Sequence, residues 1–219
     1  MLKRYKTIIK ESKGELEEKK SKFIAHVYPI ESEGQASEWI ESIQKEHNSA
    51  NHNVYAYVLG QNDEVQRYSD DGEPSGTAGL PILDLLKGES IKNTLIIVTR
   101  YFGGTLLGTG GLVRAYTHCA KEGLNQNDIV KKILSQEVDI EVDYTLLGKL
   151  QYHLNENIWV HIMDTEYLDN ITFRLLIEEE ALDAFTKSIR ELSSGKLQPI
   201  LKEKKYIVIQ GKTINVFKD

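Results

Sequence analysis

The sequence predicts an α+β protein of two domains, and three observations lead to this prediction. The chain of 219 residues is longer than the roughly 100 to 150 residues of a typical single domain. Its second part alternates strand-like and helix-like segments in the order βαββαβ, and its first part combines hairpin signals with amphipathic helices. We therefore expect one domain over residues 1–132 and a second over residues 137–219, joined near the polar stretch 125–132.

The first domain is expected to open with polar strands and a buried strand. Residues 4–10 and 15–20 flank the turn-like cluster at residues 12–14 and predict a polar hairpin. Residues 23–30 then predict a strand. The next segment places four apolar residues at i, i+3, i+4 and i+7, which predicts a helix with one buried face: Ala36, Trp39, Ile40 and Ile43. Trp39 is therefore expected in the core.

A second hairpin and a short helix follow. Residues 54–59 and 64–68 flank a segment, Gly-Gln-Asn-Asp, with the composition of a turn. Pro81 suits the first turn of a helix over residues 81–87, and Gly88 can end that helix as a left-handed cap.

The end of the first domain combines a buried strand with a helix. Residues 94–101 are β-branched and continuously apolar in their middle, as expected for a strand buried on both faces. After a glycine-rich segment, a helix over residues 112–121 is expected to end at Gly123.

The second domain is expected to be ferredoxin-like. An open sheet with two helices on one face is the simplest way to bury both apolar helix stripes in a βαββαβ chain of this length. The predicted strands are residues 137–143, 158–163, 171–178 and 205–210, and the predicted helices are residues 144–155 and 180–192.

Charge and composition narrow the function classes. The hydrophobic fraction of 40% and charged fraction of 27% are those of a folded protein. The net charge of −6 argues against broad attraction to nucleic acid, because that attraction depends on Lys and Arg. Up to residue 132 the balance is 17 basic against 18 acidic residues, and beyond it 10 against 15, so −1 and −5. A local basic patch in the first domain remains compatible with these numbers.

We expect a cytoplasmic protein with no membrane partner. The first 20 residues are charged and lack the apolar core of a secretory signal, and no apolar run approaches the length of a membrane span. The single Cys119 cannot form an internal disulfide, which agrees with a reducing compartment.

Two glycine-rich segments, residues 67–79 and 100–116, carry the candidate site. A buried strand that ends in glycines before a helix leaves backbone N–H groups free at the positive end of the helix dipole, which suits phosphate or carboxylate. Arg100 and Arg114 could add bidentate contacts, and Arg114 shares a helix face with His118. The predicted anion- or nucleic-acid-binding residues are Arg67, Ser75, Thr77, Arg100, Gly103, Gly104, Gly108, Thr109, Gly110, Gly111 and Arg114. In the alternative reading, the glycines serve only turns and close packing, and the arginines pair with carboxylates inside the protein.

Three acids and two histidines are further candidates. Asp70, Asp71 and Glu73 could hold Mg²⁺, or could orient the arginines by hydrogen bonds, or could be solvated turn residues. His47 and His52 are five residues apart, which does not place two imidazoles on one helix face for a zinc site. Both are secondary candidates, with structural or surface roles as the alternative.

No complete catalytic motif is present, and we assign no catalytic residue. After Gly108 the chain has Thr109-Gly110 where a Walker A loop needs Lys followed by Ser or Thr. The dinucleotide fingerprint would need a third glycine at Val113, and Ser75 lacks the G-x-S-x-G context of a hydrolase nucleophile.

The amino-acid sequences of several segments resemble those of the YigZ/IMPACT family. Residues 69–83 (SDDGEPSGTAGLPIL) and 98–116 (VTRYFGGTLLGTGGLVRAY) carry the resemblance, supported by residues 47–57 (HNSANHNVYAY) and 20–25 (KSKFIA). It covers most of the first 125 residues, and the tail resembles the small C-terminal domain of bacterial members. The resemblance implies a first domain like domain two of ribosomal protein S five, with a left-handed βαβ crossover, and a second domain like the fifth domain of elongation factor G.

The resemblance also implies a link to translation. Eukaryotic members regulate translation by binding the activator of an amino-acid-starvation kinase, and they carry an RWD domain that this chain lacks. We therefore expect a noncatalytic translation-associated regulator that contacts RNA, the ribosome or a translation-related protein through the arginine- and glycine-rich segments. The alternative is an enzyme acting on a small phosphorylated ligand with a carboxylate-bound metal. A third reading makes the acidic second domain a protein-interaction module.

Overall fold

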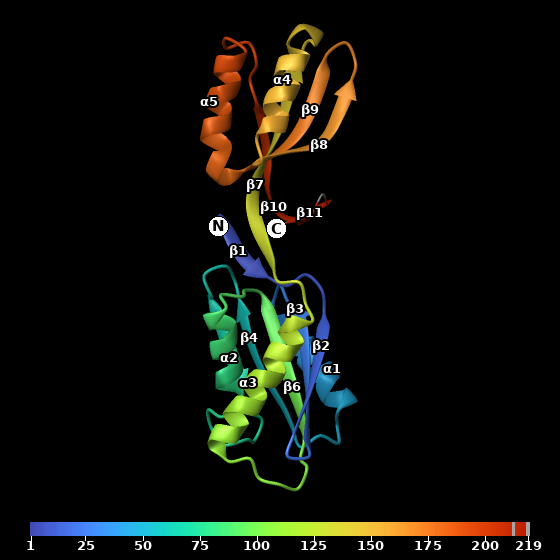
Figure 1. Ribbon diagram of the computed structural model, residues 1–219, viewed down its shortest axis with the longest axis vertical. Helices are drawn as coiled ribbons and strands as arrows, with labels where there is room; N and C mark the ends of the chain where they lie inside the picture. Colours follow the sequence, from blue (N-terminus) through green and yellow to red (C-terminus); the bar gives the residue numbers. More distant parts are fainter. Residues whose placement is uncertain (212, 218–219) are drawn as a thin grey trace. The chain divides into compact units, whose positions relative to one another are not determined.

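The computed structural model describes residues 1–211 and 213–217, and the chain forms two compact units (Figure 1). The first unit is the continuous stretch Tyr5–Lys131, and the second combines Met1–Arg4 with Lys132–Asp219. Each unit has its own sheet and its own apolar core. Within the described ranges, no helix has the length and apolar character needed to cross a membrane.

A five-stranded sheet forms the middle of the first unit, in the order β2-β3-β6-β4-β5. The central strand β6 confirms the predicted buried strand, and it is antiparallel to both neighbours. Strands β3 and β4 therefore run parallel to each other, and the chain crosses between them through α1 (Glu33–Glu46). The strands are β2 (Ser12–Glu18), β3 (Ser21–Pro29), β4 (His52–Leu59), β5 (Val65–Ser69) and β6 (Thr94–Tyr101).

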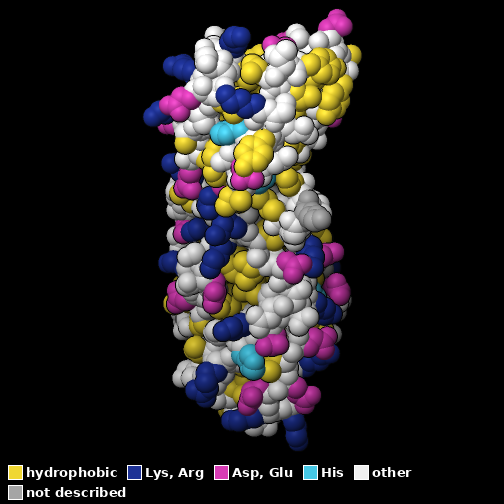
Figure 2. Space-filling view, turned by 45° about the horizontal axis from the view of Figure 1, so that its top comes forward, with side chains coloured by type: hydrophobic (Ala, Val, Ile, Leu, Met, Phe, Trp, Pro, Cys, Tyr) yellow, Lys and Arg dark blue, Asp and Glu magenta, His cyan; other side chains and the backbone are white. Residues whose placement is uncertain are grey.

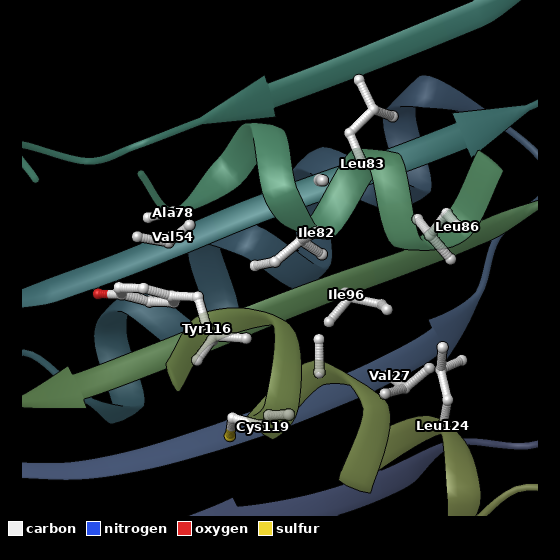
Figure 3. Close-up of a cluster of buried hydrophobic side chains, with 14 of the residues drawn as sticks. Val27, Val54, Ala78, Ile82, Leu83, Leu86, Ile96, Tyr116, Cys119 and Leu124 are labelled. Atoms are coloured by element: carbon white, nitrogen blue, oxygen red, sulfur yellow. The ribbon is translucent and has the colours of Figure 1, made fainter. Parts of the chain in front are cut away.

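Helices cover both faces of this sheet because successive side chains of a strand point to opposite faces. Helix α1 packs on the face that carries Tyr28, Tyr57 and Ile97. Helices α2 (Gly79–Gly88) and α3 (Thr109–Asn125) pack on the other face, where the larger core lies. The side chains that meet there come from both helices and the sheet (Figure 3): Ile82, Leu86, Tyr116, Leu124, Val27, Val54 and Ile96.

The predicted polar hairpin at the start of the chain is wrong. Strand β2 pairs with β3, and the turn between them lies at Lys19 and Lys20, whose φ angles are 47° and 67°. Gly14 lies inside β2, where a Cβ atom would come within 2.4 Å of the Gly123 backbone nitrogen. Both glycines thus allow β2 and α3 to touch through their backbones, so Gly14 makes no turn and Gly123 does not end α3.

Two further local expectations are corrected. The Trp39 side chain is 37% exposed and stacks on Tyr28, with ring centroids 4.0 Å apart and planes 9° apart, so it covers the core from outside. Gly88 is the last residue of α2 in an ordinary helical conformation, and Ser90, with φ of 57°, is the left-handed residue after that helix.

The second unit confirms the predicted βαββαβ order. Its sheet runs β11-β10-β7-β9-β8, with β1 (Arg4–Thr7) paired to β7, so the four predicted strands lie in the ferredoxin-like order four-one-three-two. Both helices pack on the core of this sheet through residues such as Leu150 and Phe185. The elements are β7 (Val130–Val142), α4 (Tyr144–Glu156), β8 (Val160–Tyr167), β9 (Ile171–Glu178), α5 (Leu182–Leu192), β10 (Ile200–Gln210) and β11 (Thr213–Phe217). Strand β11 was not predicted.

The first four residues of the chain are bound into the second unit. The Leu134 N–H donates to the Lys3 carbonyl oxygen at 2.9 Å, and the Tyr206 hydroxyl donates to the Leu2 carbonyl oxygen at 2.7 Å. Arg4 donates to Glu178 at 2.6 Å. The second unit is therefore assembled from both ends of the chain.

Candidate functional site

The two glycine-rich segments meet at one end of the first unit, the lower end in Figure 1. We call this surface the loop end and define it as residues 19–21, 47–52, 70–78 and 102–116. Hydrogen bonds join its parts: the Gly103 N–H donates to Ser21 Oγ at 3.1 Å, and the Phe102 N–H donates to Asn51 Oδ1 at 2.8 Å. Segments far apart in the sequence therefore form one continuous surface.

A buried polar cluster centred on Glu73 holds the loop end to the sheet. Arg100 Nη1 donates to Glu73 Oε1 at 2.6 Å, and the Tyr116 hydroxyl donates to the same oxygen at 2.7 Å. His52 Nε2 lies 3.8 Å from that oxygen. Burial, followed by the negative charge of Glu73, raises the pKa of Tyr116 well above its usual value. Figure 3 shows the Tyr116 ring within the apolar cluster and its hydroxyl at the cluster's edge.

Arg100 is positioned from several sides. Its side chain is 6% exposed and that of Glu73 is 5% exposed, so the ion pair is almost fully removed from water. The guanidinium also donates to Ser21 Oγ at 3.4 Å and lies over the rings of Phe23 and Phe102, at 5.3 and 5.5 Å from the centroids. Arg100 thus pairs with a carboxylate inside the protein, and Glu73 orients it.

Asp70 caps the loop that leads into α2. Its carboxylate accepts from the N–H groups of Gly76 at 2.8 Å, Ala78 at 3.1 Å and Gly79 at 2.8 Å. Ala78 occupies the N-cap position of α2 and supplies no side-chain acceptor, so Asp70 takes over the role of the missing cap from a distance.

We expect Asp70→Ala to lower the free energy of unfolding by about 2 kcal/mol, because three buried or half-buried N–H groups lose a charged acceptor. Urea denaturation followed by circular dichroism measures the change. Asp84→Ala, on an exposed position of α2, is the matched control and should be nearly neutral. Equal unfolding free energies for the two variants would contradict the assigned capping role.

The three acids do not converge on one point. Asp71 Oδ2 accepts from the Asn53 N–H at 2.5 Å, Glu73 faces Arg100, and Asp70 is bonded to the loop backbone. Across residues 1–211 and 213–217, no group of three or more His, Cys, Asp or Glu side chains is arranged to hold a metal ion. In this structure Asp70 and Asp71 accept hydrogen bonds from backbone N–H groups, and Glu73 accepts one from Arg100.

The glycines of the second segment have different functions. A Cβ atom on Gly103 would come within 2.0 Å of the Lys20 carbonyl carbon, so this glycine permits close packing. Gly104 and Gly108 have φ angles of 83° and 73° and open space around them. Thr109, Gly110 and Gly111 form the first turn of α3, and N–H groups in a first turn have no partner within the helix. The N-cap residue Gly108 has no side chain that could accept from them.

A pocket of about 250 Å³ lies between the Lys19–Lys20 turn and α3. Arg114 and His118, one helical turn apart, line it together with Lys19. Within the described residues, neither Arg114 nor Lys19 has a carboxylate within 4.0 Å. The lining residues are Leu16, Glu18, Lys19, Leu107, Gly111, Arg114, Ala115 and His118.

Arg67 lies apart from Arg100. In the sheet Arg67 is opposite Tyr57, on the α1 face, and its Nε atom lies 3.8 Å from Glu33. Arg100 is opposite Phe23, on the face covered by α2 and α3. The expectation that these two arginines share one surface does not hold, because their strand positions point to opposite faces.

The remaining candidates also separate. Ser75 is exposed, whereas the buried Thr77 donates its hydroxyl to the Pro74 carbonyl oxygen at 2.6 Å. His52 Nδ1 donates to the Asp71 carbonyl oxygen at 2.7 Å, beside Glu73. His47 lies 2.8 Å from the Tyr101 hydroxyl.

The two histidines do not form a shared site. The His47 ring is 5.2 Å from that of His26, which lies on the α1 face, and burial lowers the pKa of His26 to about 4. His52 is opposite Arg100 in the sheet and faces the other side.

Several residues of the loop end are not among those that the sequence predicts for the site, and Lys19, Ser21 and Tyr116 are three of them. Ser21 bonds both Arg100 and Gly103, and Tyr116 bonds Glu73. Ser21 and Tyr116 lie inside residues 20–25 and 98–116, two of the segments that carry the family resemblance, and this position is the signal that the sequence offers for them. Lys19 has no such signal, because it becomes part of the surface only through the β2–β3 turn.

Comparison with known proteins places the loop end inside a recognised domain. The Impact N-terminal domain model matches residues 19–124, and a model described as a domain of unknown function, DUF1949, matches residues 140–196. The IMPACT family member YvyE of Bacillus subtilis is 42% identical over 196 residues, which is 90% of each chain. The IMPACT family member YigZ of Escherichia coli is 34% identical over 182 residues, covering 82% of this chain and 89% of its own.

A solved structure shares the architecture of both units. It is described as the crystal structure of an hypothetical protein, and it is 30% identical with a TM-score of 0.59. The alignment covers 93% of this chain and 99% of that one, so the similarity extends over both units.

Proposed function

The chain belongs to the IMPACT family, and we propose that it is a noncatalytic, translation-associated protein that binds RNA through its loop end. The observation that carries this proposal is the combination of cationic and apolar side chains exposed together there. Lys19, Lys20 and Arg114 are exposed, and in the segment that follows β6 the residues Phe102 and Leu106 are exposed by 44% and 82%.

These two kinds of side chain are those that single-stranded RNA requires. Lys and Arg attract phosphates, and exposed aromatic rings provide surfaces on which bases stack without sequence preference. Phe102 suits this role because its backbone is held by Asn51 and its ring is supported by the Arg100 guanidinium. Leu106, four residues later in the same loop, is 82% exposed and adds apolar contact area.

The proposed binding is local. Figure 2 shows basic and acidic side chains interspersed on the face in view, which agrees with the net charge of −6. A protein of this charge gains affinity for RNA only where its few unpaired cations gather. The first unit has 14 basic against 18 acidic residues, so −4, and the second has 13 against 15, so −2. Neither unit attracts RNA by its net charge, and the proposal places the contact in the first unit because the exposed cations Lys19, Lys20 and Arg114 lie there.

The buried chemistry of the loop end supports a binding role over an enzymatic one. Glu73, whose side chain is 5% exposed, is bonded to Arg100 and Tyr116, and Asp70 is bonded to three N–H groups. Carboxylates that are bonded in this way hold the loops of the loop end in one conformation. Turnover of a phosphorylated metabolite by the protein would favour the enzymatic alternative instead.

We expect Phe102→Ala to weaken binding of a fluorescein-labelled 12-nucleotide single-stranded RNA by about 5- to 100-fold, as loss of one stacked base would. Fluorescence anisotropy in 50 mM salt measures the dissociation constant. Tyr152→Ala, which removes a ring that is 69% exposed on α4, is the matched control and should bind like the unchanged protein. Absence of RNA binding by the unchanged protein, or an equal loss in both variants, would contradict the proposed function.

A further inference from the structure

We propose that the pocket between the β2–β3 turn and α3 is a phosphate-binding subsite, with Lys19 and Arg114 as its charged ligands and His118 as a third contact. The proposal deepens the RNA-binding function and rests on it for the identity of the larger ligand. The pocket itself is a feature of the first unit alone, because all its lining residues lie between positions 16 and 118.

The arrangement of charge supports an anionic occupant. Lys19 comes from the turn and Arg114 from α3, and the two line one pocket without a carboxylate within 4.0 Å of either, among the residues described. His118 also lines the pocket, and its Nε2 atom lies 3.6 Å from Glu122, one turn further along α3. Glu18 also lines the pocket, so the two cations Lys19 and Arg114 outnumber its one carboxylate.

The shape of the pocket favours a small group over an extended one. Its volume of about 250 Å³ accommodates a phosphate group with part of the attached sugar. Leu16, Leu107 and Ala115 supply apolar walls, which lower the local dielectric and strengthen contacts to the charged atoms. Gly111 also lines the pocket, and it lies in the first turn of α3, at the positive end of the helix dipole.

The backbone of the Lys19–Lys20 turn is an independent indication of function. Both residues have positive φ angles, 47° and 67°, in a two-residue hairpin turn where Asn-Gly is the favoured sequence. Long side chains are uncommon in this conformation, and backbone strain of this kind is concentrated at functional sites. The turn is held in place by Gly103, whose backbone packs against Lys20. The turn thus has lysines at positions 19 and 20, where conformational stability alone would favour Asn and Gly.

Two variants test the subsite without disturbing the fold. Lys19→Asn removes the charge and places at φ of 47° a residue that favours this conformation, so the variant should be at least as stable as the unchanged protein. Arg114→Gln removes the second charge from an exposed helix position. Lys22→Ala is the matched control, because Lys22 lies on the same hairpin and is paired with Glu15 at 3.0 Å.

Binding of a 12-nucleotide single-stranded RNA is measured by anisotropy between 50 and 200 mM salt. For each of Lys19→Asn and Arg114→Gln, the slope of log K against log salt should fall in magnitude by about 0.7, the value for one lost phosphate contact, so that binding is about fivefold weaker at 0.1 M salt. Lys22→Ala should leave the slope unchanged. Slopes and dissociation constants equal to those of the unchanged protein in both pocket variants would overturn the subsite, while continued dependence on Phe102 would leave the RNA-binding function standing.

The source of the phosphate is distinguished by the same assay with RNA carrying a 5′ hydroxyl or a 5′ monophosphate. Equal affinities assign the pocket to an internal phosphodiester, and tighter binding of the 5′ monophosphate that is lost in Arg114→Gln assigns it to the chain terminus. Inorganic phosphate provides a readout that does not depend on RNA. It should shift the NMR amide signals of Gly111, Ala115 and His118 in the unchanged protein and not in the Lys19→Asn/Arg114→Gln double variant. If the protein binds no RNA, the presence or absence of these shifts decides the subsite by itself.

Discussion

Replacing Glu73 with alanine is expected to lower the free energy of unfolding of the first unit by about 3 to 5 kcal/mol, the cost of leaving a buried charge without its partner. Arg100 is 5% exposed, and its guanidinium contacts Glu73, Ser21 and the rings of Phe23 and Phe102. The guanidinium can reach water only if these contacts are lost. Urea denaturation followed by the fluorescence or circular dichroism of the protein measures the loss.

Two control variants separate the loss of the buried charge pair from the loss of a single hydrogen bond and from the loss of an exposed ion pair. Tyr116→Phe removes one hydrogen bond to the same Glu73 oxygen and should cost about 1 kcal/mol. Glu15→Ala removes an exposed carboxylate paired with Lys22 and should cost less than about 1 kcal/mol. The assigned role of Glu73 would be contradicted if Glu73→Ala were no more destabilising than Glu15→Ala. Combining Glu73→Ala with Arg100→Met should recover part of the loss, because the buried charge is then absent.

Gly14→Ala is expected to destabilise the first unit by about 3 kcal/mol, at the upper end of the cost of overpacking. The added Cβ would lie 2.4 Å from the Gly123 nitrogen and 2.8 Å from the Glu122 carbonyl carbon, which are backbone atoms and cannot rotate away. The Ser12 hydroxyl donates to the Gly123 carbonyl oxygen at 2.7 Å and holds β2 against α3 at this point. The strand and the helix would have to separate.

Gly88→Ala is the matched control in the same unit. A Cβ at Gly88 meets no atom within 4 Å, and the residue ends α2 with helical backbone angles. Its replacement should stabilise the protein by roughly 0.5 kcal/mol through the reduced freedom of the unfolded chain. Thermal unfolding of the two variants compares them directly, and a Gly14→Ala protein as stable as the Gly88→Ala protein would show that the contact between β2 and α3 is looser than the structure has it.

The sequence predicts the elements whose signals are local. Strand β6 is recognised from its run of β-branched residues, and the second unit from the alternation of periods two and 3.6 along the chain. The pairing of β2 with β3 is missed because Gly14 resembles a turn residue in isolation. A glycine is required at position 14 because the backbone of α3 at Gly123, more than a hundred residues later in the chain, leaves no room for a Cβ atom.

For the candidate site too, the sequence predicts the local features but not the contacts between residues far apart in the chain. The glycine-rich segments identify the loop end, but the sequence does not show which partners their charged residues take. Glu73 is 27 residues from Arg100 and 43 from Tyr116, and only the packing of α3 on the sheet brings the three together. Arg67 lies on the other face because strand β5 places it there, a fact that depends on the register of β5 with β4. Anion binding at the loop end remains a prediction that the proposed experiments test.

The inclusion of Met1–Arg4 in the second unit has a consequence for folding during synthesis. The first unit is continuous and has all its residues once position 131 has emerged from the ribosome, whereas the partners of Leu2 and Lys3, Tyr206 and Leu134, are made later. Domains generally fold as units in the order in which they are synthesised. Residues 1–4 must therefore wait until strand β10, about 200 residues later in the sequence, has been made before their unit is complete.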